Sequence, residues 1–311
     1  MKSIEKWEEG KEKYLLNNGF TLVRANEVEF GIHLAIYAGV DRDFTYSWNK
    51  LSTDWDDNNF WIYKDNKRVG GVAIEPNYLA HFFMNSPYTV DKFTIISELD
   101  NALLQWSDKS KRIYSYLIPP KDVEIYNMLG YRKQFIRRTM IHPTELFEDI
   151  QWGENLVVKT PTIEDVAEIG KVLHESYKGG IQYEEFSNNT LEDEIEISGM
   201  FLERYIATNS LHASTLVYDK NTNELVAVCL AGKNKDDDYD FSKINEVAVI
   251  PAYRRQGIAE NLIKRTLTVL KDISPATKLD VSVGNAAEGL YYKMGFFPGV
   301  QMAAMYKKPE W

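Results

Sequence analysis

Residues 251–259, PAYRRQGIA, lead from an apolar strand into a helix through a turn that carries two arginines and a glycine. At the start of a helix, unpaired backbone N–H groups and the helix dipole both present positive charge. Arg254 and Arg255 add charged donors, while Gly257 and Ala259 leave the backbone open to close approach. The turn therefore predicts a binding site for a phosphate group. A Gly-x-Gly-x-x-Gly dinucleotide turn is disfavoured, because the spacing differs and the preceding strands read as antiparallel.

The elements around this turn read as an α/β domain. Residues 155–177 give a short strand and then a helix that begins at Thr162, with Asp165 placed as in a capping box. Residues 212–232 contain two apolar runs joined by the turn DKNTNE, and a third run follows them, so we expect consecutive antiparallel strands. The remaining predicted elements are a helix from Ala259, a strand over 278–283, a short helix ending at Gly295 and a final strand over 299–308.

An internal repeat indicates two domains. EIYNMLGYR (124–132) resembles GLYYKMGFF (289–297), and a closing strand that ends at a proline follows each of them. FWIYKDNKRVGGVAI also has the strand, turn and strand form of STLVYDKNTNELVAV. The 311 residues suffice for two domains that each bury a core. We predict domains over residues 1–147 and 154–311, each a mixed, mostly antiparallel sheet flanked by helices.

Composition argues against several kinds of partner. A formal net charge of −10 without a basic tract disfavours nucleic acid and anionic membrane as partners. The five histidines have no ligand spacing, so no metal site is expected. Cys229, the single cysteine, lies in the apolar run LVAVCLA and is expected to be a buried, unreactive thiol. The first residues read as neither a signal peptide nor a membrane span, so a cytoplasmic location is expected.

Two motifs resemble those of the GCN5-related N-acetyltransferase (GNAT) superfamily. EVAVIPAYRRQGIAENLI is similar to its acyl-CoA motif Gln/Arg-x-x-Gly-x-Gly/Ala, filled here by Arg254, Gly257 and Ala259. NAAEGLYYKMGF is similar to its Asn followed by Leu-Tyr-x-x-x-Gly-Phe, although Asn285 lies one residue closer to Tyr291 than is usual. The resemblance covers residues 155–311 well and the first half in outline. It implies two tandem GNAT-like domains, acetyl-CoA as cosubstrate and no metal.

The resemblance also implies a path for the cosubstrate. The strand that ends at residues 247–249 would splay from its neighbour KLDVSV, so that the pantetheine arm pairs with main chain as a surrogate strand. The pyrophosphate would meet the amides of residues 255–260, and the N–H of Val249 would polarise the thioester carbonyl. The implied cosubstrate-binding residues are Val247, Ala248, Val249, Arg254, Arg255, Gln256, Gly257, Ile258, Ala259, Glu260 and Asn285.

Acetyl transfer to an amine needs a group that takes a proton, because an alkyl amine titrates near about pH 10, like lysine. Glu246 and Asp280, on the two splayed strands, are the candidate bases, with Glu246 preferred. A solvated strand charge is the alternative for each carboxylate. Tyr291 is the candidate acid for the departing thiolate, and a packed helix tyrosine is its alternative.

The implied activity is direct transfer of the acetyl group to an amine of a small molecule or peptide, by a monomer or homodimer. A non-catalytic acyl-CoA sensor and an acyltransferase for a longer acyl group stay open as alternatives. In the superfamily the acceptor pocket is walled by the segment after the first helix, here residues 176–196. The charged and aromatic residues of that segment and of the loop 233–241 are Tyr177, Tyr183, Glu184, Glu185, the carboxylates from Glu192 to Glu196, Asp236, Asp237 and Asp238. Such runs are commonly solvated faces, but any part that lines the cleft would attract a cationic amine.

The first half departs from the acyl-CoA motif. In NSPYTVDKFTII, the positions of Arg254, Gly257 and Ala259 are taken by Val90, Phe93 and Ile95, and Pro120 falls where Asn285 is expected. Phenylalanine in place of glycine would close the approach to phosphate. The N-terminal domain is therefore predicted to be a degenerate copy without the acyl-CoA loop, which serves in packing, substrate gating or as a scaffold.

Overall fold

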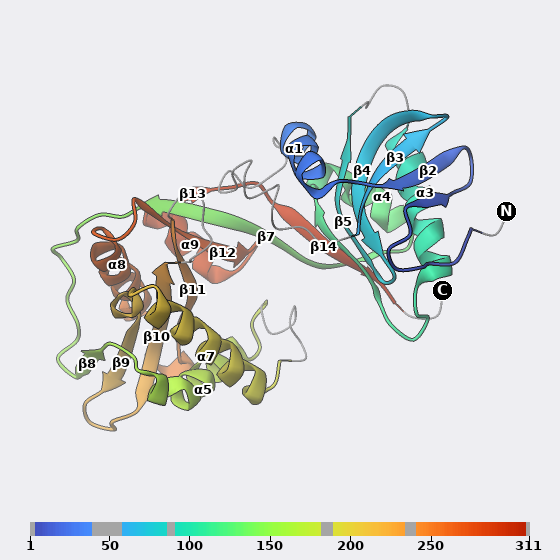
Figure 1. Ribbon diagram of the computed structural model, residues 1–311. Helices are drawn as coiled ribbons and strands as arrows, with labels where there is room; N and C mark the ends of the chain where they lie inside the picture. The colour runs from blue at the N-terminus through green and yellow to red at the C-terminus, as the bar shows by residue number, and fades with distance from the viewer. Residues whose placement is uncertain (1–3, 39–57, 86–90, 182–188, 234–240, 309–311) are drawn as a thin grey trace. The chain divides into compact units, whose positions relative to one another are not determined.

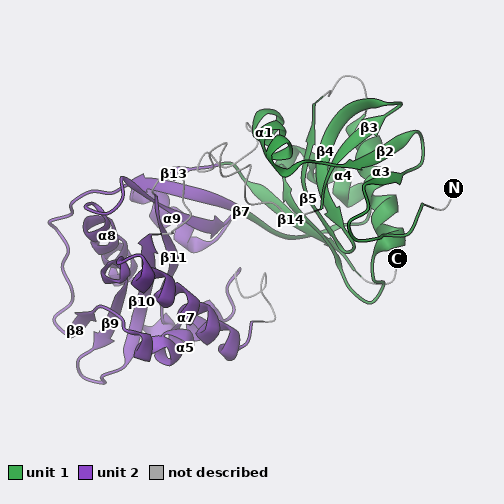
Figure 2. Cartoon of the chain, in the orientation of Figure 1, with its two compact units in different colours: residues 1–137, 300–311 green, residues 138–299 purple. Residues whose placement is uncertain are grey.

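The chain folds into two compact units (Figure 2). Unit 1 comprises Met1–Arg137 and Val300–Trp311, and unit 2 comprises Arg138–Gly299. The computed structural model describes residues 4–38, 58–85, 91–181, 189–233 and 241–308. Each unit is a mixed, mostly antiparallel sheet flanked by helices, which confirms the predicted fold class (Figure 1).

Unit 1 is built on a sheet with the strand order β1-β2-β3-β4-β5-β6-β14-β7. Its strands are β1 (Lys13–Leu15), β2 (Phe20–Arg24), β3 (Asn59–Lys64), β4 (Lys67–Glu75), β5 (Tyr78–Met84), β6 (Ile113–Ile118), β7 (Arg132–Pro143) and β14 (Met302–Lys307). The helices described in this unit are α1 (Glu27–Tyr37), α3 (Lys92–Trp106) and α4 (Val123–Met128), with the 3-10 turn η2 (Pro120–Asp122) before α4. Neighbouring strands are antiparallel except β5 and β6, which are parallel.

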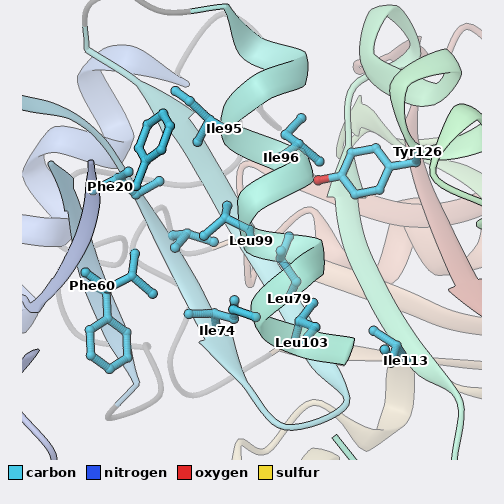
Figure 3. Packing of buried hydrophobic residues seen from close by; sticks show 14 of the residues in the cluster. Phe20, Phe60, Ile74, Leu79, Ile95, Ile96, Leu99, Leu103, Ile113 and Tyr126 are labelled. Carbon is cyan, nitrogen blue, oxygen red and sulfur yellow. The ribbon is translucent and has the colours of Figure 1, made fainter. Parts of the chain in front are cut away.

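The core of unit 1 lies between its sheet and α3. Apolar residues recur along α3 every three or four positions, so one stripe of the helix faces the sheet. Ile95, Ile96, Leu99 and Leu103 in this stripe are at most 1% exposed. Figure 3 shows them beside sheet residues such as Ile74. The spacing of these residues therefore sets the face that α3 buries.

Unit 2 has the strand order β7-β12-β11-β10-β9-β8. Its further strands are β8 (Leu156–Lys159), β9 (Thr215–Asp219), β10 (Leu225–Lys233), β11 (Ser242–Val249), β12 (Ala276–Ser282) and β13 (Phe297–Pro298), which pairs with β7. The helices described in it are α5 (Val166–Tyr177), α7 (Leu191–Ala207), α8 (Ile258–Leu270) and α9 (Ala286–Lys293), with 3-10 turns η3 (Ile163–Asp165), η4 (Leu211–Ala213) and η5 (Pro251–Tyr253). Strands β8 to β11 are antiparallel neighbours, whereas β11 and β12 are parallel.

Helices cover both faces of the unit 2 sheet, and alternate residues of β11 show which helices pack on each face. Ala248 packs in a cluster with residues of α5 and α7, while Val247 and Val249 pack against a cluster from α8 and α9. This alternation follows from the period of two in a strand. β11 is therefore a central strand that contributes side chains to both layers.

Two helical segments of unit 2 begin with capping boxes. Thr162 and Asp165 form the predicted one, in which Thr162 N donates to Asp165 Oδ2 over 2.7 Å. Thr190 and Asp193 form a second capping box at the start of α7, in which Thr190 N donates to Asp193 Oδ2 over 2.7 Å. The sequence does not predict this helix, because the carboxylates from Glu192 to Glu196 read as a solvated face or as part of the acceptor-pocket wall. They occupy the first turn of α7, where the helix dipole stabilises negative charge.

The two units divide the chain differently from the predicted domains 1–147 and 154–311. β14, near the end of the chain, lies within unit 1, where Tyr306 pairs with Tyr114 of β6 and Arg132 of β7. Residues 138–143 of β7 belong to unit 2, where Ile141 pairs with Phe297 of β13. Hydrogen-bond partners decide which sheet a closing strand joins, and the sequence repeat carries no signal for that choice.

Candidate active site

A cleft opens where β11 and β12 separate. Their parallel pairing stops at Ile244 and Leu279, although β11 continues to Val249 and β12 to Ser282. The cleft has a volume of about 890 Å³. Every predicted site residue lines it except Gln256, which lies exposed in the same loop. The separation predicted from the family resemblance is thus present, and it begins one residue after Ile244.

A β-bulge in β11 lies at the point of separation. Glu246 pairs with Leu230 and Ile244 pairs with Ala231, so Asn245 is an extra residue on β11. A bulge bends its strand and increases the local twist, which turns the end of β11 away from β12. The side-chain amide of Asn245 donates to the hydroxyl of a tyrosine in α7 over 2.7 Å. This hydrogen bond fixes the bulged residue.

The end of β11 directs main-chain groups into the cleft. In an antiparallel pair, the N–H and C=O of alternate residues point toward the partner strand. Ile250 N donates to Val226 O over 3.0 Å, so Ala248 also faces β10. The N–H groups of Val247 and Val249 therefore point to the other side, where β12 has moved away. Such groups can pair with an extended ligand or polarise a carbonyl.

The turn before α8 presents open amides to the same cleft. Gly257 is the N-cap of α8 with φ of 79°, and Arg255 is also left-handed with φ of 65°. A Cβ on Gly257 would have no neighbour within 4 Å, so the space beside it is open to a ligand. No side chain caps the helix, which leaves its first N–H groups available to an anion.

The one acidic side chain in the first turn of α8 is neutralised. Lys293 Nζ lies 2.9 Å from Glu260 Oε2, and Lys264 Nζ lies 3.3 Å from Glu260 Oε1. Lys293 first, and Lys264 with it, hold the pKa of Glu260 below its usual value. These two lysines reduce the repulsion that Glu260 would exert on a bound phosphate.

Arg254 occupies a place that the sequence did not predict. Its Nε donates to Val249 O over 3.0 Å, and its Nη2 donates to Ser176 O over 2.6 Å. The guanidinium therefore joins the end of β11 to the end of α5. Arg254 and Arg255 are both exposed in the loop. Of the two predicted phosphate donors, only Arg255 has a guanidinium without a described hydrogen bond to the protein.

The two candidate bases differ in their surroundings. Glu246 accepts a hydrogen bond on Oε2 from the hydroxyl of Tyr177, the last residue of α5. Asp280 is 38% exposed, accepts from Lys243 Nζ and from Thr139 Oγ1 over 2.6 Å each, and is thereby paired with a cation. A carboxylate that is already paired with a lysine is the weaker base. The geometry therefore favours Glu246.

Tyr291 lines the cleft from α9. It is 8% exposed and packs against Phe296, with ring centroids 5.6 Å apart. Burial, followed by the nearby Cys229 and Glu246, raises its pKa well above the usual value for tyrosine. Within the described part of the chain its hydroxyl has no hydrogen-bond partner. The phenol therefore stays protonated at neutral pH and can donate a hydrogen bond or a proton.

Asn285 has a local structural role. It is the N-cap of α9, and its Oδ1 accepts from Ala287 N over 2.9 Å. Glu288 accepts from Gly284 N over 3.1 Å and is 3.2 Å from the Nε of Arg138 on β7. The turn before Tyr291 is thus held in part by a residue from the end of the first sequence repeat, which sequence reasoning missed.

Some predicted residues lie elsewhere. Tyr183, Glu184, Glu185, Asp236, Asp237, Asp238 and Val90 lie outside the described residues. Glu194 is the buried member of the α7 carboxylates and accepts from Asn189 Nδ2 over 3.2 Å. Cys229 is buried in β10 beside Thr266, and burial raises the pKa of its thiol to about 12. Both features disfavour the reactive thiolate form, in agreement with the buried thiol that the sequence predicts.

The described residues lack two further kinds of feature. They contain no group of three His, Cys, Asp or Glu side chains that could hold a metal ion. None of their helices is long and apolar enough to cross a membrane.

Part of unit 2 matches a known protein family, and the whole chain is similar in fold to several solved structures. The model of the acetyltransferase (GNAT) family matches residues 181–296. A comparison with curated proteins gives no match. Among solved structures, the chain is similar to a GCN5-related N-acetyltransferase from Sphaerobacter thermophilus, with 12% identity, a TM-score of 0.70, and coverage of 95% of this chain and 98% of that one.

Two further solved structures are similar over nearly the whole chain. A tandem GNAT protein from the clavulanic acid biosynthesis pathway has 8% identity and a TM-score of 0.56, covering 94% of this chain and 98% of that one. A GNAT-family acetyltransferase from Colwellia psychrerythraea has 12% identity and a TM-score of 0.54, covering 93% and 99%. At these identities the solved structures show the fold, and the family model matches one segment of unit 2. Residues 181–296 thus match the acetyltransferase (GNAT) family, which transfers acyl groups from acyl-CoA, and the chain as a whole has the fold of GNAT acetyltransferases, a tandem one included.

Proposed function

We propose that the chain is an acetyl-CoA-dependent N-acetyltransferase that acts on an amine of a small molecule or peptide. The cleft between β11 and β12 is the main support, because one opening joins an uncapped helix start, outward main-chain N–H groups, a carboxylate and a protonated phenol. The open space beside Gly257 suits a pyrophosphate close to the amides of α8.

Each group has a distinct task in this proposal. The amides at the start of α8 hold the pyrophosphate, and the N–H of Val249 donates to the thioester carbonyl as charge builds on its oxygen. The amine nitrogen forms a bond to the acyl carbon as the carbon–sulfur bond breaks. Glu246 takes the proton that leaves nitrogen, and Tyr291 gives a proton to sulfur. The products are an amide and free CoA.

The amine side of the cleft is acidic. Glu246 lines it, and the buried Glu194 lies nearby: burial first, then Glu246 and, to a smaller extent, Glu194 raise the pKa of Tyr177. Negative potential at a partly enclosed site raises the local concentration of a cationic acceptor. We therefore infer that the amine arrives as an ammonium ion and releases its first proton to solvent, so that Glu246 accepts the second proton during transfer.

The test is release of CoA from acetyl-CoA by the full-length protein in the presence of diamines, amino sugars and lysine peptides. Free thiol is measured with a thiol reagent, and the acetylated amine is identified by mass spectrometry. Cys229 does not contribute, because its thiol is buried. Acetylation of at least one amine supports the proposal. Binding of acetyl-CoA without any acetylated amine across the panel would instead indicate a sensor. Faster transfer from a longer acyl-CoA would correct the acyl group.

A further inference from the structure

Tyr177 and Glu246 form a partly buried hydrogen bond, which has no role in the acetyl transfer proposed above. Tyr177 ends α5, and its hydroxyl donates to Glu246 Oε2 at the wall of the cleft. Burial first, and then the charge of Glu246, raise the pKa of Tyr177 well above its usual value. The phenol therefore stays protonated and acts as the donor throughout the working pH range.

A second set of hydrogen bonds fixes the main chain beside Tyr177. Arg254 Nη2 binds the carbonyl of Ser176 over 2.6 Å, and Arg254 Nε binds the carbonyl of Val249 over 3.0 Å. One guanidinium thus connects the loop before α8, the end of β11 and the residue that precedes Tyr177. Because a guanidinium is planar and rigid, it fixes the relative positions of the two carbonyls.

We propose that Tyr177 is a positioning residue for Glu246, and that Arg254 holds Tyr177 in place from the acyl-CoA loop. The inference rests on the proposed function, since it takes Glu246 as the base. An O–H donor on a carboxylate stabilises the charged form and restricts the side chain to one orientation. The acyl-CoA side and the amine side of the cleft are then connected by the series Val249, Arg254, Ser176, Tyr177 and Glu246.

Other polar groups face Glu246 from the elements around it. These are Tyr205 of α7, Cys229 of β10 and Tyr291 of α9, whose pKa values Glu246 raises, with Glu194 of α7 near Tyr177. Burial is the main cause that raises the pKa values of the first three, so they stay protonated at neutral pH. Among these described neighbours, Tyr177 has the one hydroxyl that donates to Glu246.

The first test is Tyr177→Phe, which removes one hydroxyl and keeps the ring. Loss of the donor should move the acidic limb of the kcat/KM profile for the amine to higher pH and lower kcat/KM about 10-fold, as expected for one hydrogen bond to a charged group. The dissociation constant for CoA should not change. Tyr218→Phe is the matched control, because Tyr218 donates to Glu168 over 3.0 Å and neither residue lines the cleft. This control should leave the pH profile unmoved.

A second readout does not depend on turnover. In protein carrying 13C-labelled glutamate carboxyl groups, Glu246→Gln assigns the resonance of Glu246. Its titration should move to higher pH in Tyr177→Phe and stay in place in Tyr218→Phe. An unchanged titration of Glu246 in folded Tyr177→Phe would overturn the inference even if the parent protein acetylates amines. A shifted titration without any acetylation would support the contact and reject the proposed function.

Arg254→Met and Arg255→Met separate positioning from phosphate binding. Arg254→Met should lower kcat/KM for the amine about 10-fold while the dissociation constant for CoA changes less than about threefold, because its guanidinium binds carbonyls. Arg255→Met should weaken CoA binding and leave the acidic limb in place. The opposite pattern, with Arg254→Met weakening CoA binding most, would remove Arg254 from the positioning role.

Discussion

Both units run a strand into a helix at equivalent points of the fold, and the two helices differ at the residue that begins them. In unit 2 the N-cap of α8 is Gly257, which has no side chain and leaves the first amides open. In unit 1 the N-cap of α3 is Asp91, whose Oδ2 accepts from Thr94 N over 2.9 Å. The carboxylate of Asp91 thus takes the place that an external anion would occupy. One N-cap residue can decide whether this fold presents an anion site.

Aligning α3 with α8 by structure changes which residue of unit 1 corresponds to Gly257. Counting from the proline in each repeat places Phe93 at Gly257, but Phe93 is the second residue of α3. Counting from the start of each helix places Asp91 there. The first unit thus differs at this point by a carboxylate that caps its own helix.

The strands of unit 1 still separate as they do in unit 2. The pairing of β5 and β6 stops at Leu79 and Ser115, and an irregularity near His81, with φ of 55°, lies in β5 just beyond. Lys92, the first residue of α3, is 2.8 Å from Asp122, so an ion pair connects the starts of α3 and α4. Unit 1 thus keeps the strand geometry and differs at the helix starts. This supports the proposal that it does not bind acyl-CoA.

Gly257→Asp should have the largest effect, because it copies Asp91 into unit 2. A carboxylate beside the open amides repels the pyrophosphate and competes for the same donors, so we expect about 100-fold weaker CoA binding or more. Gly257→Asn is the matched control, since asparagine is neutral and tolerates a positive φ. The Gly257→Asn variant should lose far less affinity for CoA than Gly257→Asp. Equal losses in the two variants, measured by calorimetry, would show that charge at the N-cap does not distinguish the units.

The two carboxylates of the cleft give the next largest contrast. Glu246→Gln should lower kcat about 100-fold, as for removal of a general base. Asp280→Asn should change kcat less than about threefold, because Lys243 and Thr139 already occupy this carboxylate. Steady-state rates with a saturating amine test this order. A larger loss in Asp280→Asn would exchange the two assignments.

Tyr291→Phe should lower kcat about 10-fold and leave KM for acetyl-CoA nearly unchanged, since proton donation to the leaving sulfur acts in the transition state. Because burial raises the pKa of Tyr291, the phenol stays protonated through neutral and mildly alkaline pH. In the parent protein, ionisation of Tyr291 should therefore cause no fall of kcat with rising pH below about pH 10, and the Tyr291→Phe variant should show the same alkaline profile. A full rate in the variant would leave Tyr291 as a packing residue.

Asp91→Ala should have the smallest effect on function and a measurable one on stability. Loss of a helix cap lowers the free energy of unfolding by about 1 kcal/mol. CoA binding should not change, because the proposed site lies in unit 2. Urea unfolding and calorimetry on the same protein give both quantities. A change in CoA affinity would mean that unit 1 takes part in binding.

Features decided by neighbouring residues could be predicted from the sequence. The capping box at Thr162, the hairpin of β9 and β10, and the turn before Gly257 each depend on a few adjacent residues. The family resemblance added the separation of β11 and β12, which no local pattern encodes. Strand bulges such as the one at Asn245 follow from pairing between distant strands.

Partners that lie far apart in the chain could not be predicted. The carbonyl that Arg254 binds belongs to Ser176, 78 residues away, and the hydroxyl on Glu246 comes from Tyr177, 69 residues away. The sequence gives both residue types but not their contact. Strand pairing in the sheet also brings Lys243 and Thr139 to Asp280. This contact makes Asp280 the weaker of the two candidate bases.

The most direct test of the account is the stoichiometry of CoA binding to the full-length chain, measured by isothermal titration calorimetry. Unit 2 has an uncapped helix start beside an open cleft, whereas unit 1 has a helix capped by Asp91. We therefore predict one CoA per chain, lost in Gly257→Asp and kept in Asp91→Ala. Two sites per chain, no binding, or one site that survives Gly257→Asp would contradict the account.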